Sequence, residues 1–221
     1  MTDHLIVFAK NPQPGNVKTR LTPLLSDVQA AQLAEAFLLD VLSMCAGLAG
    51  LWRTLQYAPV GCRARMLELA GPDWRVKLQR GNDLGERMEH ALGVRLTGET
   101  TRAVIIGSDS PQIPPERILE AYEALEEHDM VLGPCDDGGF YLVGLRRWVP
   151  DIFAGVRWSC PETLSDTIRR ADELGVSFTL LEGAYDIDDE AALQRLVGEL
   201  KATPNGHLEQ TRKALGEFGL V

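Results

Sequence analysis

The sequence is poor in the residues that build metal and disulfide frameworks. Its 221 residues include only four cysteines and four histidines. No two cysteines form a C-x-x-C pair, and no two histidines have the H-x-x-x-H spacing. We therefore expect neither a structural zinc site nor a disulfide framework. The cysteines are Cys45, Cys62, Cys135 and Cys160, and the histidines are His4, His90, His128 and His207.

Positive charge is also scarce. The chain has 22 lysines and arginines against 32 aspartates and glutamates, which gives a formal net charge of −10 and a pI of about 4.9. General nucleic-acid binding needs a basic face, so we expect no nucleic-acid partner. An acidic surface is still compatible with a local basic site for one small anionic ligand.

Long hydrophobic runs are missing as well. No apolar run approaches the ~20 residues of a membrane span, and the first residues show no signal-peptide pattern. We therefore expect a soluble cytoplasmic protein without a membrane partner. The sequence leaves the oligomeric state open.

Hydrophobic residues make up 45% of the chain, and they form short apolar runs that alternate with stretches of helical spacing. This alternation predicts one α/β domain over residues 1–221, with a largely parallel sheet covered on both faces. The run 140–145 follows 129–134 too closely for a crossover, which predicts an antiparallel strand. Strands are expected at 5–9, 51–57, 74–79, 102–107, 129–134, 140–145 and 176–181. Helices are expected at 26–47, 63–70, 161–174, 189–200 and 206–218, with two more opening near Asp83 and at Pro114-Pro115.

A basic loop, KNPQPGNVKTR, follows the first predicted strand. In open α/β sheets, ligands bind at the carboxyl ends of strands. Pro14 stiffens this loop, and Gly15 lets the backbone approach a ligand. Lys10, Lys18 and Arg20 supply the charge to bind a di- or triphosphate. The alternative is a solvated loop whose cations balance nearby acids.

Carboxylates follow two other predicted strands. Asp109 comes directly after the most hydrophobic strand, where it would hold Mg²⁺ together with phosphate oxygens. Asp186 and Asp188 are alternate residues of an extended segment, so both would face one ion. The alternatives are a turn-forming role for Asp109 and helix capping by Asp188 or Asp189.

The segment DDGG predicts a tight hairpin turn. Its paired glycines, Gly138 and Gly139, also let a ligand approach the backbone, and Asp137 would bind an acceptor. We therefore assign these three residues to substrate binding, with the turn alone as the alternative.

Two further segments are candidate ligand contacts. Arg157, Trp158 and Ser159 precede a predicted helix, whose N-terminus favours anions. Core packing by Trp158 and capping by Ser159 are the alternatives. Gly81 and Asp83 lie in a loop suited to a base or sugar, although capping by Asp83 also explains its position.

Six ordered motifs carry a family resemblance over nearly the whole chain: AKNPQPGNVKTRL, GNDLGERM, GSDSP, GPCDDGGFYLVGL, VRWS and YDIDDEAAL. Together they resemble the DUF2064, or radical-SAM/selenodomain-associated transferase 1, family. The resemblance implies the fold of the GT-A, or nucleotide-diphospho-sugar transferase, superfamily, a three-layer Rossmann-like α/β/α sandwich with a mixed sheet.

The resemblance also implies roles for individual residues. Lys10, Lys18 and Arg20 would hold nucleotide phosphates, and Asp109 would hold the metal. Asp186 and Asp188 resemble the second metal-binding pair of the guanylyltransferases of deazaflavin-cofactor synthesis. The chain departs from the Asp-x-Asp of many glycosyltransferases, because Gly107-Ser108-Asp109-Ser110 contains a single acid.

Three hypotheses follow for the function. The first is a nucleotidyltransferase in which an acceptor attacks a nucleoside triphosphate, with Lys18, Arg20 and Asp109 as catalytic groups and Mg²⁺ (or Mn²⁺) as cofactor. The second is a glycosyltransferase that uses a nucleotide-sugar, with Asp137 as general base. The third is a non-catalytic nucleotide-binding module. The base and the small-molecule acceptor cannot be assigned from the sequence.

Overall fold

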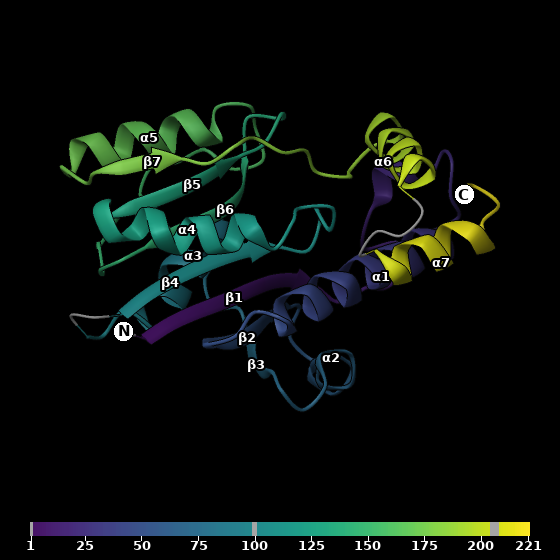
Figure 1. The fold of residues 1–221 in the computed structure, drawn as a ribbon, viewed down its shortest axis with the longest axis horizontal. Helices are drawn as coiled ribbons and strands as arrows, with labels where there is room; N and C mark the ends of the chain where they lie inside the picture. Colours follow the sequence, from purple (N-terminus) through teal and green to yellow (C-terminus); the bar gives the residue numbers. More distant parts are fainter. Residues whose placement is uncertain (1, 99–100, 204–207) are drawn as a thin grey trace.

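A seven-stranded sheet forms the centre of the protein, as the computed structural model shows for residues 2–98, 101–203 and 208–221 (Figure 1). Its strand order is β3-β2-β1-β4-β6-β5-β7. Only β6 runs antiparallel to its neighbours, β4 and β5, so the predicted antiparallel strand is confirmed. The strands are β1 (Thr2–Lys10), β2 (Leu51–Ala58), β3 (Arg75–Leu78), β4 (Thr101–Gly107), β5 (Met130–Pro134), β6 (Phe140–Leu145) and β7 (Phe178–Leu180).

Helices cover both faces of the sheet, which confirms the predicted three layers. Because side chains alternate along a strand, β4 places Val104 and Ile106 in one core cluster, with α1, α2 and α4. Its Ala103 and Ile105 lie in the opposite cluster, with α3 and α5. The helices are α1 (Asp27–Ala46), α2 (Arg63–Ala70), α3 (Leu84–Gly93), α4 (Glu116–Glu127), α5 (Thr163–Glu173), α6 (Glu190–Ala202) and α7 (Glu209–Glu217), with the 3₁₀ turn η1 (Thr19–Leu21).

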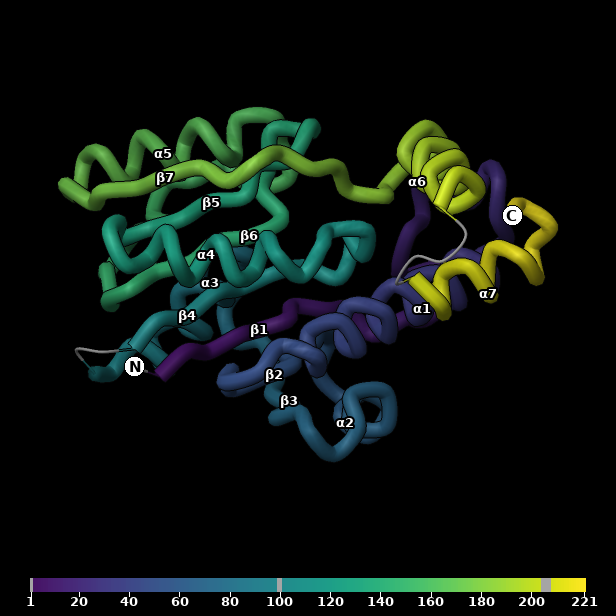
Figure 2. Tube along the Cα trace, in the orientation of Figure 1, coloured from purple at the N-terminus to yellow at the C-terminus, as the bar shows by residue number. Residues whose placement is uncertain are grey.

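A third core cluster lies beyond the carboxyl ends of the strands. It joins Leu21 of η1 and Phe37 of α1 to the C-terminal helices. The trace in Figure 2 shows α7 alongside α1 and α6 above them. The segment before α6 contributes Tyr185 and Ile187 to the same cluster, so the chain around Asp186 is anchored in packed hydrophobic side chains.

Most of the predicted helix ends are confirmed. Ser26 forms a capping box with Gln29 at the start of α1, and the side chains of Asp83 and Asp189 cap α3 and α6. The helix predicted at 161–174 is present as α5 but begins two residues later, at Thr163, and neither its cap residue nor Ser159 supplies a side-chain cap. The last helix begins at Glu209, and residues 206 and 207 of its predicted range lie outside the described residues.

Helix α1 is long and apolar enough to cross a membrane by length and composition, contrary to our expectation that no segment would be. More than half of the relevant window, 56%, is buried inside the structure. The helix packs against the sheet through Leu38, Val41 and Leu42. Its hydrophobicity is therefore accounted for by the core.

Asp129 connects β5, β6 and β7 at the end of the sheet opposite the third core cluster, through its carboxylate and its backbone N–H. Its side chain is 11% exposed and accepts hydrogen bonds from Arg146 at 2.8 Å and from Arg147 at 3.1 Å, both directly after β6. The backbone N–H of Asp129 donates to Ser177 Oγ, just before β7. Hydrogen bonds from Arg147 and Arg146 outweigh the effect of partial burial and lower the pKa of Asp129 to about 2.

We expect Asp129→Asn to destabilise the fold at neutral pH but not at pH 2. A lowered folded-state pKa stabilises the protein above the ordinary pKa near 3.8, and this contribution is lost as the pH falls toward 2. Because both arginines are partly exposed, we expect a loss of only about 1–2 kcal/mol at pH 7. Urea unfolding of wild type and variant from pH 7 to pH 2 measures it, with the exposed Asp73→Asn as control. An equal difference at both pH values would contradict the ionic account.

A buried aspartate on α1 holds the N-terminus of α7. Asp40 is 4% exposed, and its carboxylate accepts from the backbone N–H of Gln210 at 3.0 Å and of Thr211 at 2.8 Å. It also accepts from Thr211 Oγ1 at 2.6 Å. A helix N-terminus leaves such N–H groups without partners inside the helix, so α1 supplies the cap that α7 lacks in its own sequence.

Asp40→Asn should destabilise the protein by about 2–3 kcal/mol, because an amide NH₂ would face N–H donors inside the core. Thr211→Val removes only the hydroxyl bond, for which we expect about 1 kcal/mol. Denaturant unfolding measures both, and amide hydrogen exchange should show the loss of protection concentrated in α7. Equal effects of the two substitutions would contradict a capping role for the carboxylate.

Candidate functional site

Four segments meet at the edge where the six parallel strands end: the basic loop after β1, the turn after β4, the β5–β6 turn, and the extended segment 181–188 after β7. Backbone hydrogen bonds hold this segment in place. The N–H of Ala184 donates to the carbonyl of Pro134 at 2.9 Å, and the N–H of Ile187 donates to the carbonyl of Asp109 at 3.1 Å. The segment therefore crosses the ends of β5 and β4 and brings Asp186 and Asp188 to Asp109.

Lys18 lies at the centre of this edge. Its ammonium is 2.5 Å from Asp109 Oδ1 and 2.8 Å from Asp188 Oδ1, and its side chain is only 3% exposed. The Nζ atom also lies 5.5 Å from the centre of the Phe37 ring. Burial alone would lower the pKa of Lys18, but the charges of Asp109 and Asp188 outweigh it and raise the pKa.

The two carboxylates paired with Lys18 remain open to solvent. The side chains of Asp109 and Asp188 are 55% and 49% exposed. Partial desolvation by the surrounding residues would raise the pKa of Asp109, but the charges of Lys18 and, to a smaller extent, Lys10 outweigh it and lower the pKa. Each carboxylate contacts Lys18 through Oδ1, and neither Oδ2 atom accepts a hydrogen bond from a residue that the structure describes.

Asp186 has a different environment from its neighbours. Ser110 Oγ donates a short hydrogen bond to its Oδ1, and the Cys135 thiol lies 3.5 Å from the same atom. Burial and the charges of Asp109, Asp188 and Asp137 raise the pKa of Asp186, and the bond from Ser110 only partly offsets this. The site thus contains a carboxyl group that has no cationic partner among the described residues.

The other residues of the basic loop are exposed. Lys10 forms no ion pair with a described residue, but its charge reaches Asp109. Arg20 is in η1, also without a described ion-pair partner. Pro14 and Gly15 are exposed, and Gly15 adopts φ +77°. The structure therefore brings Lys18 into contact with two of the three predicted metal ligands, Asp109 and Asp188, while Asp186 contacts Ser110 and Cys135 and Lys10 and Arg20 remain exposed.

The β5–β6 turn packs against the start of α5. Asp137 Oδ1 accepts from the N–H of Gly139 at 2.8 Å, as the predicted turn requires. The carbonyl of Gly138 accepts from the N–H of Leu164 at 2.8 Å. Gly138 has φ +86°, and a side chain there would collide with the backbone of Pro161. Oxygen or sulfur atoms of Asp137, Asp186 and Cys135 lie within 4.8 Å of one another, so this turn joins the acidic site.

The predicted contacts at 157–159 have structural partners of their own. The Arg157 guanidinium forms two hydrogen bonds with the buried Asp166, at 2.7 and 3.1 Å, and remains 62% exposed. Trp158 packs edge-on against Phe140 and Phe153. Ser159 has φ +58° and makes no cap. Packing therefore accounts for Trp158, while ligand binding by these three residues stays a prediction.

The loop before α3 is fixed in a similar way. Asp83 Oδ1 accepts from the N–H of Glu86 at 2.8 Å, and the carbonyl of Gly81 accepts from Arg87 Nε at 3.1 Å. Gly85 leaves room for the Trp158 indole, which a Cβ atom would meet. Capping and packing explain this loop, and its contact with a base or sugar stays a prediction.

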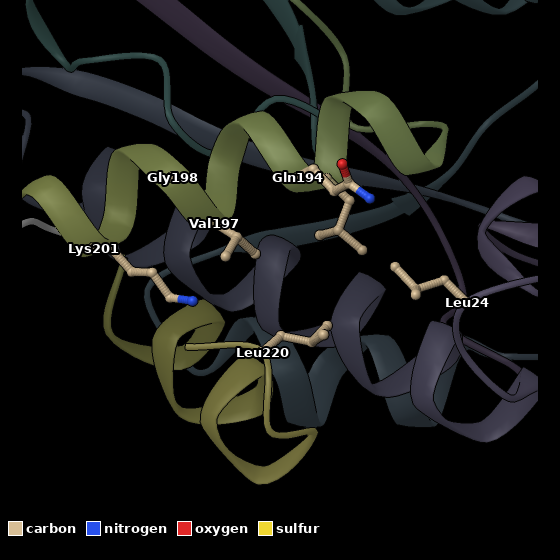
Figure 3. A pocket seen from close by; sticks show the side chains of 7 residues that line it. Leu24, Gln194, Val197, Gly198, Lys201 and Leu220 are labelled. Carbon is tan, nitrogen blue, oxygen red and sulfur yellow. The ribbon is translucent and has the colours of Figure 1, made fainter.

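A separate hollow of about 280 Å³ lies at α6 and the C-terminal segment (Figure 3). Leu24, Val197 and Leu220 line it, with the ammonium of Lys201 at one side. It contains no carboxylate among its lining residues and only one cation. It therefore lacks the groups for phosphate chemistry, which the strand-end cluster provides.

Comparison with known proteins identifies the family. A model of a family of uncharacterized proteins conserved in bacteria, DUF2064, matches residues 41–160, more than half of the chain. The chain belongs to the DUF2064 family. The predicted resemblance is thereby confirmed.

This DUF2064 chain also resembles solved structures of other proteins. A putative nucleotide-diphospho-sugar transferase from Desulfovibrio desulfuricans G20 is 30% identical, with a TM-score of 0.90 over 100% of this chain and 97% of the other. CMP:2-keto-3-deoxy-manno-octonic acid synthetase complexed with CTP is 12% identical, with a TM-score of 0.58 over 91% and 99% of the two chains. The first confirms the predicted fold, and the second shows a likeness of fold alone.

A 3-phospho-D-glycerate guanylyltransferase from Phenylobacterium zucineum (strain HLK1) is 29% identical over an alignment 178 residues long that covers 77% of this chain and 79% of the other. The DUF2064 chain is thus similar in sequence to a guanylyltransferase.

Three members of the site were missed by the sequence analysis. Ser110 follows Asp109 in GSDSP, and its hydrogen bond to the partly buried carboxyl of Asp186 was not visible from the motif. Cys135 precedes the acidic turn and reads as an ordinary strand residue. Phe37 belongs to the apolar stripe of α1, where nothing distinguishes it from core. Each depends on a contact between segments distant in sequence.

Gly138→Ala should disrupt the β5–β6 turn. The new methyl group would meet the Pro161 backbone at a positive φ, so we expect a loss of about 2–4 kcal/mol. Gly139→Ala is the matched control, because its Cβ would meet only the side chain of Asp137 at 3.1 Å. Thermal and urea unfolding of both variants measure the difference. Similar stabilities of the two would show that the turn tolerates rearrangement against α5.

Proposed function

We propose that this protein is a metal-dependent nucleotidyltransferase that transfers a nucleoside monophosphate from a nucleoside triphosphate to a small phosphorylated or hydroxyl acceptor, releasing pyrophosphate. We expect this reaction to take place in the cytoplasm. The observation that carries the proposal is the meeting of Lys18 with Asp109 and Asp188 at the carboxyl ends of β1 and β4. The similarity to a guanylyltransferase supports it.

The chain supplies groups suited to phosphoryl chemistry and needs no nucleophilic side chain. An acceptor oxygen attacks the α-phosphorus, the bond to the bridging oxygen breaks, and its electron pair leaves with pyrophosphate. Lys10 and Arg20, both exposed beside the site, would neutralise the charge that develops on the leaving group. Such positioning and electrostatic stabilisation provide most of the catalysis in phosphoryl transfer.

The residues present fit a bound Mg²⁺. The donor set is carboxylate oxygen, which Mg²⁺ prefers together with phosphate oxygens. Asp109 and Asp188 each keep one oxygen without a described partner, and Asp186 lacks a cationic partner among the described residues. These three residues would hold the ion, which when bound would neutralise phosphate charge. The Cys135 thiol is a softer ligand, less suited to Mg²⁺.

GTP and a phosphorylated small acid are the first substrates to test. The relative from Phenylobacterium zucineum is named for 3-phospho-D-glycerate and guanylyl transfer. Arg157 retains an exposed face beyond its bonds to Asp166, which suits the anionic group of such an acceptor. Asp137, Gly138 and Gly139 would line the acceptor side, and Gly81 and Asp83 the nucleotide side.

Glycosyl transfer is the second candidate. It is favoured by the close similarity to a putative nucleotide-diphospho-sugar transferase. Asp137, exposed in the turn beside Asp186, would then act as general base toward the acceptor hydroxyl. The single acid in the GSDS segment, in place of Asp-x-Asp, makes it second.

Pyrophosphate release tests the reaction class. The purified protein is incubated with Mg²⁺, each of the four nucleoside triphosphates, and acceptors that include 3-phosphoglycerate. We expect acceptor-dependent pyrophosphate with one base, strongest for GTP, and a nucleotidyl-acceptor product by ³¹P NMR. Release of nucleoside diphosphate from a nucleotide-sugar, with no pyrophosphate from any triphosphate, would favour glycosyl transfer instead. Inactivity toward both substrate classes would favour a non-catalytic binding module.

Asp109→Asn should lower kcat by a factor on the order of 10²–10³ without unfolding the protein, because it removes the charge at the end of β4. Asp136→Asn is the matched control: Asp136 lies on the neighbouring turn, is 71% exposed and pairs with Arg195. Steady-state pyrophosphate assays give kcat and KM for both, and thermal unfolding checks the fold. An Asp109→Asn enzyme with unchanged kcat would remove Asp109 from the reaction.

A further inference from the structure

The acidic site contains one internal cation, Lys18. The ammonium of Lys18 lies between Asp109 Oδ1 and Asp188 Oδ1, at 2.5 and 2.8 Å. It is almost completely excluded from solvent, while both carboxylates are half exposed. A buried ammonium is stable only when paired with opposite charge, so these contacts determine where the side chain lies.

One ammonium does not neutralise the site. Asp186 and Asp137 lie close enough to add negative charge to the same cluster. A second cation, Lys10, acts on Asp109 only through its charge, because it forms no ion pair with a described residue. The residual negative charge therefore favours a further cation, and the Oδ1 atoms of Asp109 and Asp188 that it would need are already in contact with Lys18.

The backbone of Lys18 also indicates a held conformation. Lys18 adopts φ +49° and ψ +35°, the left-handed region, directly before η1. Residues other than glycine rarely adopt this region without compensating interactions. The two ion pairs of Lys18 provide the compensating interactions. Gly15, at φ +77° in the same loop, allows the backbone of this loop to change conformation.

We infer that Lys18 holds the place of a divalent cation between Asp109 and Asp188 in the free protein, and that a metal ion entering this site displaces its ammonium toward the phosphates of a bound nucleotide. The movement of the Lys18 ammonium to nucleotide phosphates rests on the proposed function, whereas the competition between Lys18 and the metal for the two carboxylates does not. The Lys18 ammonium then has two alternative partners, the carboxylates of Asp109 and Asp188 or the nucleotide phosphates. Binding of the metal and binding of the nucleotide each favour its release from the carboxylates.

The exchange has a thermodynamic consequence. In the free protein the metal must compete with an internal cation, so its affinity is low. A nucleotide that takes the ammonium removes the competitor and raises metal affinity, and the coupling is reciprocal. Removing the ammonium by mutation should therefore strengthen the binding of the metal alone and reduce the coupling.

Titration with Mn²⁺ in the absence of nucleotide tests the competition. Free Mn²⁺ is followed by its electron paramagnetic resonance signal for wild type and Lys18→Met. We expect the variant to bind Mn²⁺ at least about tenfold more tightly, within the usual range of coupling between sites. Equal or weaker binding by Lys18→Met would overturn the inference.

Two matched variants separate competition from general electrostatics. Lys10→Met removes the same charge from the same loop but no ion pair, so Mn²⁺ affinity should rise by less than about threefold. Lys18→Arg retains a cation and should stay near the wild-type affinity. An increase for Lys10→Met as large as that for Lys18→Met would attribute the effect to net charge and overturn the exchange.

Lysine labelling of the wild-type protein gives a second test, which stands even if Lys18→Met fails to fold. Reductive methylation followed by peptide mass spectrometry should find Lys18 protected and the exposed Lys10 reactive. Saturating Mg²⁺ alone should raise the labelling rate of Lys18 several-fold relative to Lys10. An unchanged Lys18 rate under Mg²⁺ that demonstrably binds would overturn the displacement.

The two proposals fail separately. Both tests use the metal without nucleotide or turnover, so they decide the exchange whatever reaction the protein performs. Pyrophosphate release together with unaltered metal affinity in Lys18→Met would leave nucleotidyl transfer standing and remove the exchange. Tighter Mn²⁺ binding without any pyrophosphate release would do the reverse.

Discussion

The ion pairs of Lys18 are the interaction on which the arrangement of the site depends. They join the loop after β1 to the end of β4 and to a segment 170 residues further along the chain. Without the ammonium, Asp109 and Asp188 would repel each other and Asp186. Without the carboxylates, a buried lysine would have no partner. Each side therefore offsets charge that destabilises the other, so the acidic site and the basic loop depend on each other.

The C-terminal helices make this pairing possible from a distance. Tyr185 and Ile187 are buried with α6 and α7, and Asp186 and Asp188 alternate with them. Because alternate residues of an extended chain face opposite sides, anchoring the apolar pair directs the acidic pair toward the strand ends. Asp40, by capping α7, holds the same cluster against α1. The position of two carboxylates thus depends on hydrophobic packing outside the sheet.

The sequence predicted the fold well because local signals agreed with one another. Short apolar runs and stretches of helical spacing each matched an element of the structure. The strand order, the third core and the partners of Arg157 were not predictable in this way. Asp166 takes the guanidinium fork that we assigned to a ligand, and residue identity alone does not distinguish a cation bound to a carboxylate from one awaiting a phosphate.

The same limit applied to Lys18, and it explains why the sequence left two interpretations of the basic loop open. One assigned its cations to a phosphate, and the other assigned them to nearby acids. The structure shows the second arrangement for Lys18, while Lys10 and Arg20 remain exposed. The two interpretations are not exclusive when the acids have a second possible partner. A nucleoside triphosphate brings negative charge to a cluster that is already acidic, so its approach is favourable only if positive charge accompanies it. A divalent cation that replaces the ammonium at the carboxylates would meet this requirement twice, by neutralising the acids and by freeing Lys18 for the phosphates.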